Sequence, residues 1–218
     1  MNRIARPAAW LGLALCLSSV IGFGAALDGY SQVRHPVALL GARDIAHAAI
    51  FNALGFVLPG LLVALVAIVL RTRLDGAGWA ARIGARMWLL SALAFAAQGL
   101  WPLDPTNLDA PASRVHAALW SLWWVAFVPG AGLLAVGLPR RSGRHMLALA
   151  AAVAAVLVAL FAVFAPYTLA PAGVAQRLAF AAWFGCFVVA AYSDAARGVA
   201  GSTTLRDEVR RTKPRRTG

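Results

Sequence analysis

Six long apolar runs, separated by short polar segments, organise this chain. They cover Ala8–Leu27, Ala48–Leu70, Met87–Trp101, Val115–Leu138, Met146–Pro166 and Leu178–Tyr192. Because an α-helix rises about 1.5 Å per residue, about 20 apolar residues cross a hydrocarbon core of about 30 Å. Four runs reach that length. The third and the sixth are shorter and must extend into their flanks, with Arg86 and Arg177 snorkelling toward the headgroups and Trp101 at headgroup depth. The pattern predicts six transmembrane helices.

The composition supports the same fold class. Apolar residues make up 61% of the chain and charged residues 13%, whereas a soluble domain carries about 25% charged residues. Such a chain cannot cover a water-facing surface, which excludes a soluble enzyme, a disordered chain and a small disulfide scaffold. Cys16 and Cys186 each lie inside an apolar run, which predicts buried free thiols. We therefore expect an all-α integral membrane protein.

The distribution of basic residues predicts how the chain is threaded. The formal net charge is +12. If the N-terminus is cytoplasmic, 16 of the 20 Lys and Arg residues lie on the inner side, and the outer side holds only Arg34, Arg43, Arg114 and Arg177. This positive-inside bias predicts cytoplasmic termini in a bacterial inner membrane. Because the charge lies in short segments between apolar runs, we expect no nucleic-acid partner. A cleaved signal peptide is the alternative reading of the first run and leaves five spans in the same orientation.

The chain divides into a membrane bundle and a short tail. Residues 1–196 contain the six runs, and residues 197–218 are polar and basic, which predicts disorder. The tail is expected to attract anionic lipids, at about 1 kcal/mol per basic residue near the surface. Docking of a partner protein is the alternative role. The oligomeric state does not follow from these features.

The second and fourth runs resemble each other. From His47 the chain reads HAAIFNALGFVLPG, and from His116 it reads HAALWSLWWVAFVPG. The repeat predicts a duplicated helical hairpin, in which Pro59 and Pro129 each remove a backbone hydrogen bond and kink the helix.

The start of each repeat carries a candidate helix cap. Asp44 and Ser113 precede the two histidines by three residues, where an N-cap is expected. This interpretation places His47 and His116 at the third helical position, at the interface between bilayer and water.

Two stretches carry a resemblance to a known family. They read HPVALLGARDIAHAAIFNALGFVLPGLL and QGLWPLDPTNLDAPASRVHAALWSLWW. The region from Asp28 to Leu138 resembles a bacterial family of six-span membrane proteins catalogued as domain of unknown function 998. The resemblance implies an inner-membrane helical bundle, and it carries no activity onto any residue.

Uncommon polar residues gather on the predicted outer side. We expect a site between the second and fourth helices that binds a lipid headgroup, a small solute or a partner protein. Its candidate residues are Asp28, Arg43, Asp44, His47, Asn52, Gln98, Asp104, Arg114 and His116. Arg43 is expected to pair with Asp28 or Asp104. The competing structural interpretation makes these residues caps, turns and interfacial side chains, and assigns Trp120, Trp123 and Trp124 to an aromatic belt.

Three chemical readings of the same residues stay open. A divalent metal held by His47, His116 and Asp104 or Asp44 would activate water and make the protein a metal-dependent membrane hydrolase. A haem between the two histidines, with Arg43 and Arg114 near its propionates, would make it a cytochrome. The third reading is a solute carrier, although the apolar runs hold no charged residue for ion coupling. The histidines lack metal-motif spacing, so a non-catalytic role without a cofactor is the leading expectation; whether the protein is an enzyme stays open.

Overall fold

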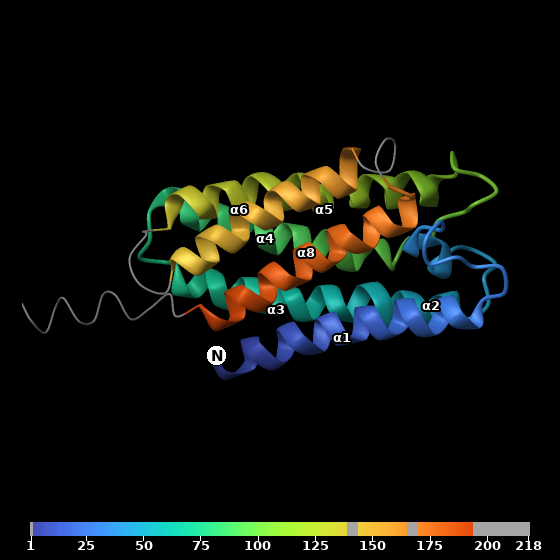
Figure 1. Cartoon of the computed structure of the whole chain (residues 1–218), viewed down its shortest axis with the longest axis horizontal. Coiled ribbons are helices and arrows are strands. Elements are labelled where there is room, and N and C mark those ends of the chain that lie inside the picture. Colours follow the sequence, from blue (N-terminus) through green and yellow to red (C-terminus); the bar gives the residue numbers. More distant parts are fainter. Residues whose placement is uncertain (1, 139–143, 165–169, 194–218) are drawn as a thin grey trace, which may run out of the picture.

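A computed structural model describes residues 2–138, 144–164 and 170–193 of the chain (Figure 1). Every element in these ranges is helical. The elements are α1 (Asn2–Ala26), the 3₁₀ turn η1 (Val37–Gly41), α2 (Ala48–Phe51), the π turn η2 (Asn52–Val57), α3 (Leu58–Arg73), α4 (Trp79–Gln98), α5 (Pro111–Gly137), α6 (His145–Ala159), the π turn η3 (Leu160–Phe164) and α8 (Ala172–Tyr192). Elements α2, η2 and α3 form one continuous helix.

Six of these helices are long and apolar enough to cross a membrane, which confirms the six predicted spans. The short third run is part of a longer helix that starts at Trp79 and already contains Arg82 and Arg86. That helix ends at Gln98, so Trp101 lies in the connection that follows. The sixth helix starts at Ala172, six residues before its apolar run. In both helices the backbone hydrogen bonding therefore begins several residues before the apolar run, because a polar helix end is tolerated at headgroup depth.

Two other helices also begin earlier than their apolar runs. Helix α1 includes Arg6 and Pro7, and α5 starts at Pro111 rather than at Val115. Proline is favoured in the first helical turn because its missing N–H has no helical partner there, and this accounts for Pro111. Pro7, in contrast, lies inside α1. The predicted basic tail, residues 197–218, lies outside the described residues.

The six spans form a closed ring in chain order. Each helix packs against the next, from α1 to α3, α4, α5 and α6, and α8 then closes the ring by contacting both α6 and α1. We call the end of the bundle that carries the connections 27–47 and 99–110 the outer end, after the orientation that the arginine distribution predicts. Figure 1 shows the N-terminus and the end of α8 together at the opposite, inner end.

The core of the bundle is aromatic. Trp88, Phe95, Trp123, Trp183 and Phe187 are fully buried, and their rings contact one another across α4, α5 and α8. The assignment of Trp123 to an aromatic belt is therefore wrong. Both cysteines are buried and free, as predicted.

Helix α4 sits between the two helices that carry the sequence repeat, and glycines allow the close approach. A Cβ added to Gly60 of α3 would lie 2.6 Å from the backbone N of Ala96, and one added to Gly130 of α5 would lie 2.8 Å from the Cβ of Met87. Small residues bring helix backbones together in membranes, where burial of apolar surface supplies no driving force. The Pro-Gly pairs of the repeat therefore mark two contacts with α4.

Candidate functional site

The two outer connections are joined, as the sequence predicted, by Arg43 and Asp104. The Arg43 Nη1 atom lies 3.6 Å from Asp104 Oδ2, and the Arg43 backbone N–H donates to the Leu103 carbonyl at 2.8 Å. The guanidinium is largely exposed, whereas the carboxylate is mostly shielded. Of the two partners expected for Arg43, Asp104 is the one that forms the ion pair.

Asp104 organises the turn that follows it. Its Oδ1 atom accepts hydrogen bonds from the Thr106 hydroxyl at 2.7 Å and from the backbone N–H groups of Thr106 and Asn107. The Thr106 hydroxyl bond, with these backbone N–H groups and the Arg43 charge, lowers the pKa of Asp104 although burial opposes the shift. All these partners belong to the chain itself, so the ionised carboxylate has a structural role in the turn.

Ser113 is not the N-cap of the fourth span. Helix α5 begins at Pro111 after the N-cap residue Ala110, so Ser113 is its third residue. Its hydroxyl accepts from the Asp104 backbone N–H at 3.0 Å and donates to the Asn107 carbonyl at 3.1 Å. The side chain therefore ties the second outer connection to the helix.

Asp44 is not an N-cap either. The residue before α2 is His47, and no side chain caps this helix end. Asp44 and His47 both have left-handed backbones, with φ of 63° and 60°. Both are exposed. A β-carbon makes this backbone region unfavourable, so the tight turn that enters the second span forces both residues into it.

The two histidines of the repeat have different environments. His47 lies on the surface beside a groove of about 350 Å³ lined by Ser18, Ser19 and neighbouring residues of α1. His116 is buried as the sixth residue of α5, and its Nδ1 atom lies 3.0 Å from the Trp101 carbonyl. The prediction that both histidines occupy the third helical position is therefore wrong.

The remaining predicted residues differ in their surroundings. Asn52 is buried and donates from Nδ2 to the Gly41 carbonyl at 2.9 Å, which closes the first outer connection onto the second span. Gln98 is buried without a hydrogen-bond partner for its amide. Asp28 is exposed, and Arg114 makes only a surface pair with Asp109 at 3.4 Å. Among the nine residues, the structure thus brings Arg43 to Asp104 and the His116 ring to the backbone of Gln98.

Within residues 2–138, 144–164 and 170–193, no three His, Cys, Asp or Glu side chains form a group that could hold a metal ion. The metal set of His47, His116 and Asp104 stays a prediction without a supporting contact, and so does the hydrolase built on it. The haem reading also lacks support, because one histidine is exposed and the other is buried.

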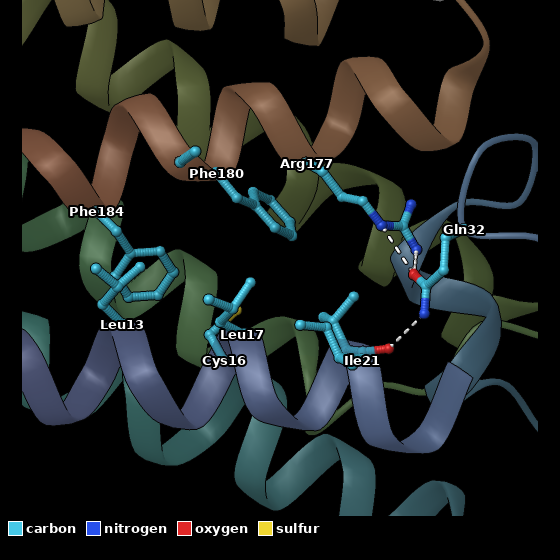
Figure 2. Close-up of a pocket in the computed structure, with 10 residues that line it drawn as sticks. Leu13, Cys16, Leu17, Ile21, Gln32, Arg177, Phe180 and Phe184 are labelled. Atoms are coloured by element: carbon cyan, nitrogen blue, oxygen red, sulfur yellow. Dashed lines mark hydrogen bonds between the residues drawn. The ribbon is translucent and has the colours of Figure 1, made fainter. Parts of the chain in front are cut away.

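A different part of the molecule offers a shaped site. Helices α1 and α8 lie side by side and leave between them a groove of about 260 Å³, which we call the lateral groove (Figure 2). It is lined by Leu13, Cys16, Leu17, Val20, Ile21, Gln32, Arg177, Phe180, Ala181 and Phe184. All but Gln32 and Arg177 are apolar or weakly polar. Pockets for drug-sized ligands run from about 300 to 1,000 Å³, so the lateral groove suits a single chain or ring.

The outer end of the lateral groove is closed by a network centred on Arg177 (Figure 2). Its Nε and Nη2 atoms donate to Gln32 Oε1, and Nη2 also donates to the Tyr30 hydroxyl at 2.7 Å. Its Nη1 atom donates to the carbonyls of Gly173 at 2.7 Å and His35 at 3.2 Å. The five N–H groups of the guanidinium are all engaged, so the side chain is fixed at the head of the groove.

Close packing of backbone supports this network. A Cβ added to Gly173 would lie 2.6 Å from the His35 carbonyl oxygen and 2.7 Å from that of Val33, so only glycine lets α8 approach the first outer connection this closely. One turn further, Gln176 accepts from the Val37 backbone N–H at 2.6 Å. The start of α8 and the connection 27–47 therefore form one hydrogen-bonded unit.

Among the described residues, the charge of Arg177 is not paired with a carboxylate. All acceptors around Arg177 are neutral oxygens, and no carboxylate of the described ranges lies within ion-pair distance of it. Burial raises the pKa of Tyr30 despite the nearby Arg177 charge, so the phenol stays protonated at neutral pH. The Arg177 guanidinium therefore lies beside an apolar groove without a carboxylate partner in the described ranges.

A second contact joins α1 and α8 at the inner end. The Trp10 indole N–H donates to the Tyr192 hydroxyl at 3.1 Å, and the Arg6 guanidinium lies 4.7 Å from the centre of the Tyr192 ring. The two helices are thus held at both ends, and the lateral groove lies between these contacts.

The sequence did not reveal this site. Arg177 was expected to snorkel from the sixth helix, and neither Gln32 nor Tyr30 was a candidate. The available signal was a lone arginine beside Gln176 at the start of an apolar run, on the side that holds few basic residues. Nothing in the sequence pairs it with Gln32, which lies 145 positions earlier.

The fold defines the class: this is an all-helical, multi-pass membrane protein with six spans. The family model described as "Protein of unknown function (DUF998)" matches residues 10–193. The chain therefore belongs to the DUF998 family, which confirms the resemblance and extends it beyond residues 28–138. No curated protein and no solved structure matches the chain.

Proposed function

We propose that this protein binds an amphipathic membrane molecule, with one hydrocarbon chain in the lateral groove and its polar head at Gln32 and Arg177. The observation that carries the proposal is a lateral groove walled by apolar side chains and closed at one end by a charged side chain. A bilayer lipid has the same division into an apolar chain and a polar head. The proposal keeps the lipid binding expected from the sequence and places it between α1 and α8.

The dimensions suit one chain of such a molecule. Leu13 and Ile21 line the α1 wall and lie eight residues apart, about 12 Å along a helix. Phe180 and Phe184 form the opposite wall, one helical turn apart (Figure 2). A slot of this length and of about 260 Å³ accepts part of one acyl chain.

Photo-crosslinking tests the proposal. A phospholipid with a diazirine in its acyl chain is reconstituted with the full-length protein, and labelled peptides are identified after illumination. We expect labelling of residues 13–21 and 180–184 to exceed that of residues 153–156 of α6, whose side chains Val153 and Val156 are also exposed and do not line the lateral groove. Equal labelling of all lipid-facing helices would show only general contact with the bilayer and would contradict the proposal.

A matched pair of variants sharpens this test. Ala181→Leu adds bulk to an exposed alanine that lines the lateral groove, whereas Ala14→Leu adds the same bulk to an exposed alanine of α1 that does not. We expect Ala181→Leu to lower labelling of the groove peptides severalfold and Ala14→Leu to leave it unchanged. An equal effect of both variants would count against an occupant of the lateral groove.

We also propose that the protein lies in a bacterial inner membrane with both termini in the cytoplasm. The support is the predominance of basic residues on the predicted inner side. A reporter fused after Arg216 is expected to stay inside, and a cysteine placed at Asp109, an exposed residue of the connection 99–110, is expected to react with an impermeant thiol reagent from outside. The reverse result would place the head of the lateral groove in the cytoplasmic leaflet.

A further inference from the structure

We infer that the lateral groove selects anionic phospholipids over zwitterionic ones, through the uncompensated charge of Arg177. The inference rests on the proposed function and adds the class of headgroup. It combines three observations: the charge has no carboxylate partner in the described part of the chain, it is held rigidly, and a free donor lies beside it.

The rigidity comes from how the guanidinium is bound. The protein engages all five N–H groups with neutral oxygens from the connection 27–47 and from Gly173. The hydrogen bonds therefore orient Arg177 without cancelling its charge, which remains available to an anion. A charge preorganised in this way needs no reordering when the anion binds.

Gln32 supplies the free donor. Its Oε1 atom accepts from Arg177, and its Nε2 atom donates one hydrogen to the Val20 carbonyl at 2.9 Å. The second Nε2 hydrogen has no acceptor among the residues that the structure describes. Both Gln32 and Arg177 line the lateral groove. An oxygen of an anionic headgroup placed here would gain one hydrogen bond and the attraction of the arginine charge.

The surroundings favour a negative rather than a neutral ligand. The connection 27–47 holds two carboxylates, Asp28 and Asp44, and the first turns of α8 hold none. Both carboxylates are exposed, and neither forms an ion pair with Arg177. Low dielectric beside the groove strengthens the attraction between unlike charges. Because the walls are apolar, a free anion without a hydrocarbon chain would leave most of the groove empty.

The test compares two lipids with identical acyl chains. The full-length protein is delipidated in a neutral detergent and incubated with dioleoyl phosphatidylglycerol or dioleoyl phosphatidylcholine, and native mass spectrometry counts the lipids retained. We expect phosphatidylglycerol to bind about fivefold more tightly, the attraction that one basic residue near a membrane surface supplies. Added salt should reduce the difference.

Three variants locate the selectivity. Arg177→Gln removes the charge and should equalise the two lipids, whereas Arg177→Lys keeps the charge and should keep the preference. Arg34→Gln serves as the matched control, because it removes an exposed charge from the connection 27–47 at a residue that does not line the lateral groove. Unfolding midpoints are measured for all three variants. If Arg177→Gln does not fold, labelling of residues 30–35 and 173–177 of the wild-type protein by a headgroup-diazirine phosphatidylglycerol decides the question.

The outcomes separate the two proposals. Equal binding of both lipids, with binding still blocked by Ala181→Leu, would overturn the charge selectivity and leave the lateral groove as a lipid site. Binding that Ala181→Leu does not affect would overturn both. Displacement of phosphatidylglycerol by millimolar inorganic phosphate would show that the site takes the free anion and would overturn the lipid assignment.

Discussion

The helices that begin near His47 and near His116 share a sequence pattern and differ in what surrounds it. Their glycines play the same part, because Gly60 and Gly130 each bring a helix against α4. Their histidines do not, since His47 is exposed in a left-handed turn and His116 is buried in a regular helix. The two helices therefore share their packing against α4, and they do not share a polar site.

The prolines show the same divergence. Pro59 follows a π turn over Asn52–Val57, whereas α5 continues as an α-helix through Pro129. A π turn inserts one residue into the helical hydrogen-bond pattern and is one way to accommodate a proline. The two helices thus respond differently to the same residue, and the likeness of sequence predicted only their packing against α4.

The largest effect is expected from the shared glycines. Gly60→Ala and Gly130→Ala each place a Cβ closer than 3.0 Å to atoms of α4, so each should lower the free energy of unfolding by about 1–3 kcal/mol. Gly132→Ala is the control, because a Cβ there meets nothing within 4 Å and alanine is favoured over glycine within a helix by about 0.5–1 kcal/mol. Thermal unfolding in detergent measures all three. Similar losses at positions 130 and 132 would refute the close-packing account.

Substitution of the two histidines should change the free energy of unfolding by clearly different amounts. His116→Ala removes a buried ring together with its contact to the Trp101 carbonyl and is expected to cost about 2 kcal/mol. His47→Ala changes an exposed residue and should stay within about 0.5 kcal/mol of wild type. Chemical unfolding monitored by tryptophan fluorescence gives both values. A larger loss at position 47 would reverse the comparison.

Substitution of the polar residues five positions after the histidines should give a smaller difference in the free energy of unfolding. Asn52→Ala leaves the Gly41 carbonyl without its 2.9 Å donor and should cost about 1–2 kcal/mol. The equivalent Ser121 is exposed, so Ser121→Ala should have little effect. The same unfolding assay compares them, and equal stabilities of the two variants would show that the Asn52 bond contributes nothing.

The smallest effect concerns the carboxylates near the two helix starts. Hydrogen bonds lower the folded-state pKa of Asp104 below its ordinary value of 3.8, so its ionised form stabilises the fold. Asp104→Asn should lower stability at pH 7, and this difference should shrink as the pH falls through 3.8 and below. Asp44→Asn is the control and should show no comparable loss at pH 7. The measurement is the unfolding midpoint from pH 7 to pH 3, and a difference that grows on acidification would contradict the assignment.

The outer site shows why the sequence predicted some contacts and missed others. Asp104 was one of the two partners predicted for Arg43, with Asp28 as the other, because all three residues lie in connections at the same end of the bundle. The caps were assigned wrongly because a residue three positions before a histidine reveals nothing about where the helix starts. Ala110 and His47 precede the helices instead, and Ser113 holds the Asp104 turn.

By itself the sequence determined the class of protein, the six spans and the family, because apolar runs long enough to cross a bilayer have few alternatives. It also marked the Pro-Gly pairs, whose glycines proved to be points of close packing. Only the tertiary structure decided that α8 closes the ring against α1 and that Arg177 meets Gln32 across 145 positions. The physical reason is that hydrophobicity fixes how deep a helix lies in the membrane, whereas side-chain packing fixes its neighbours and its rotation, and a groove exists only between particular neighbours.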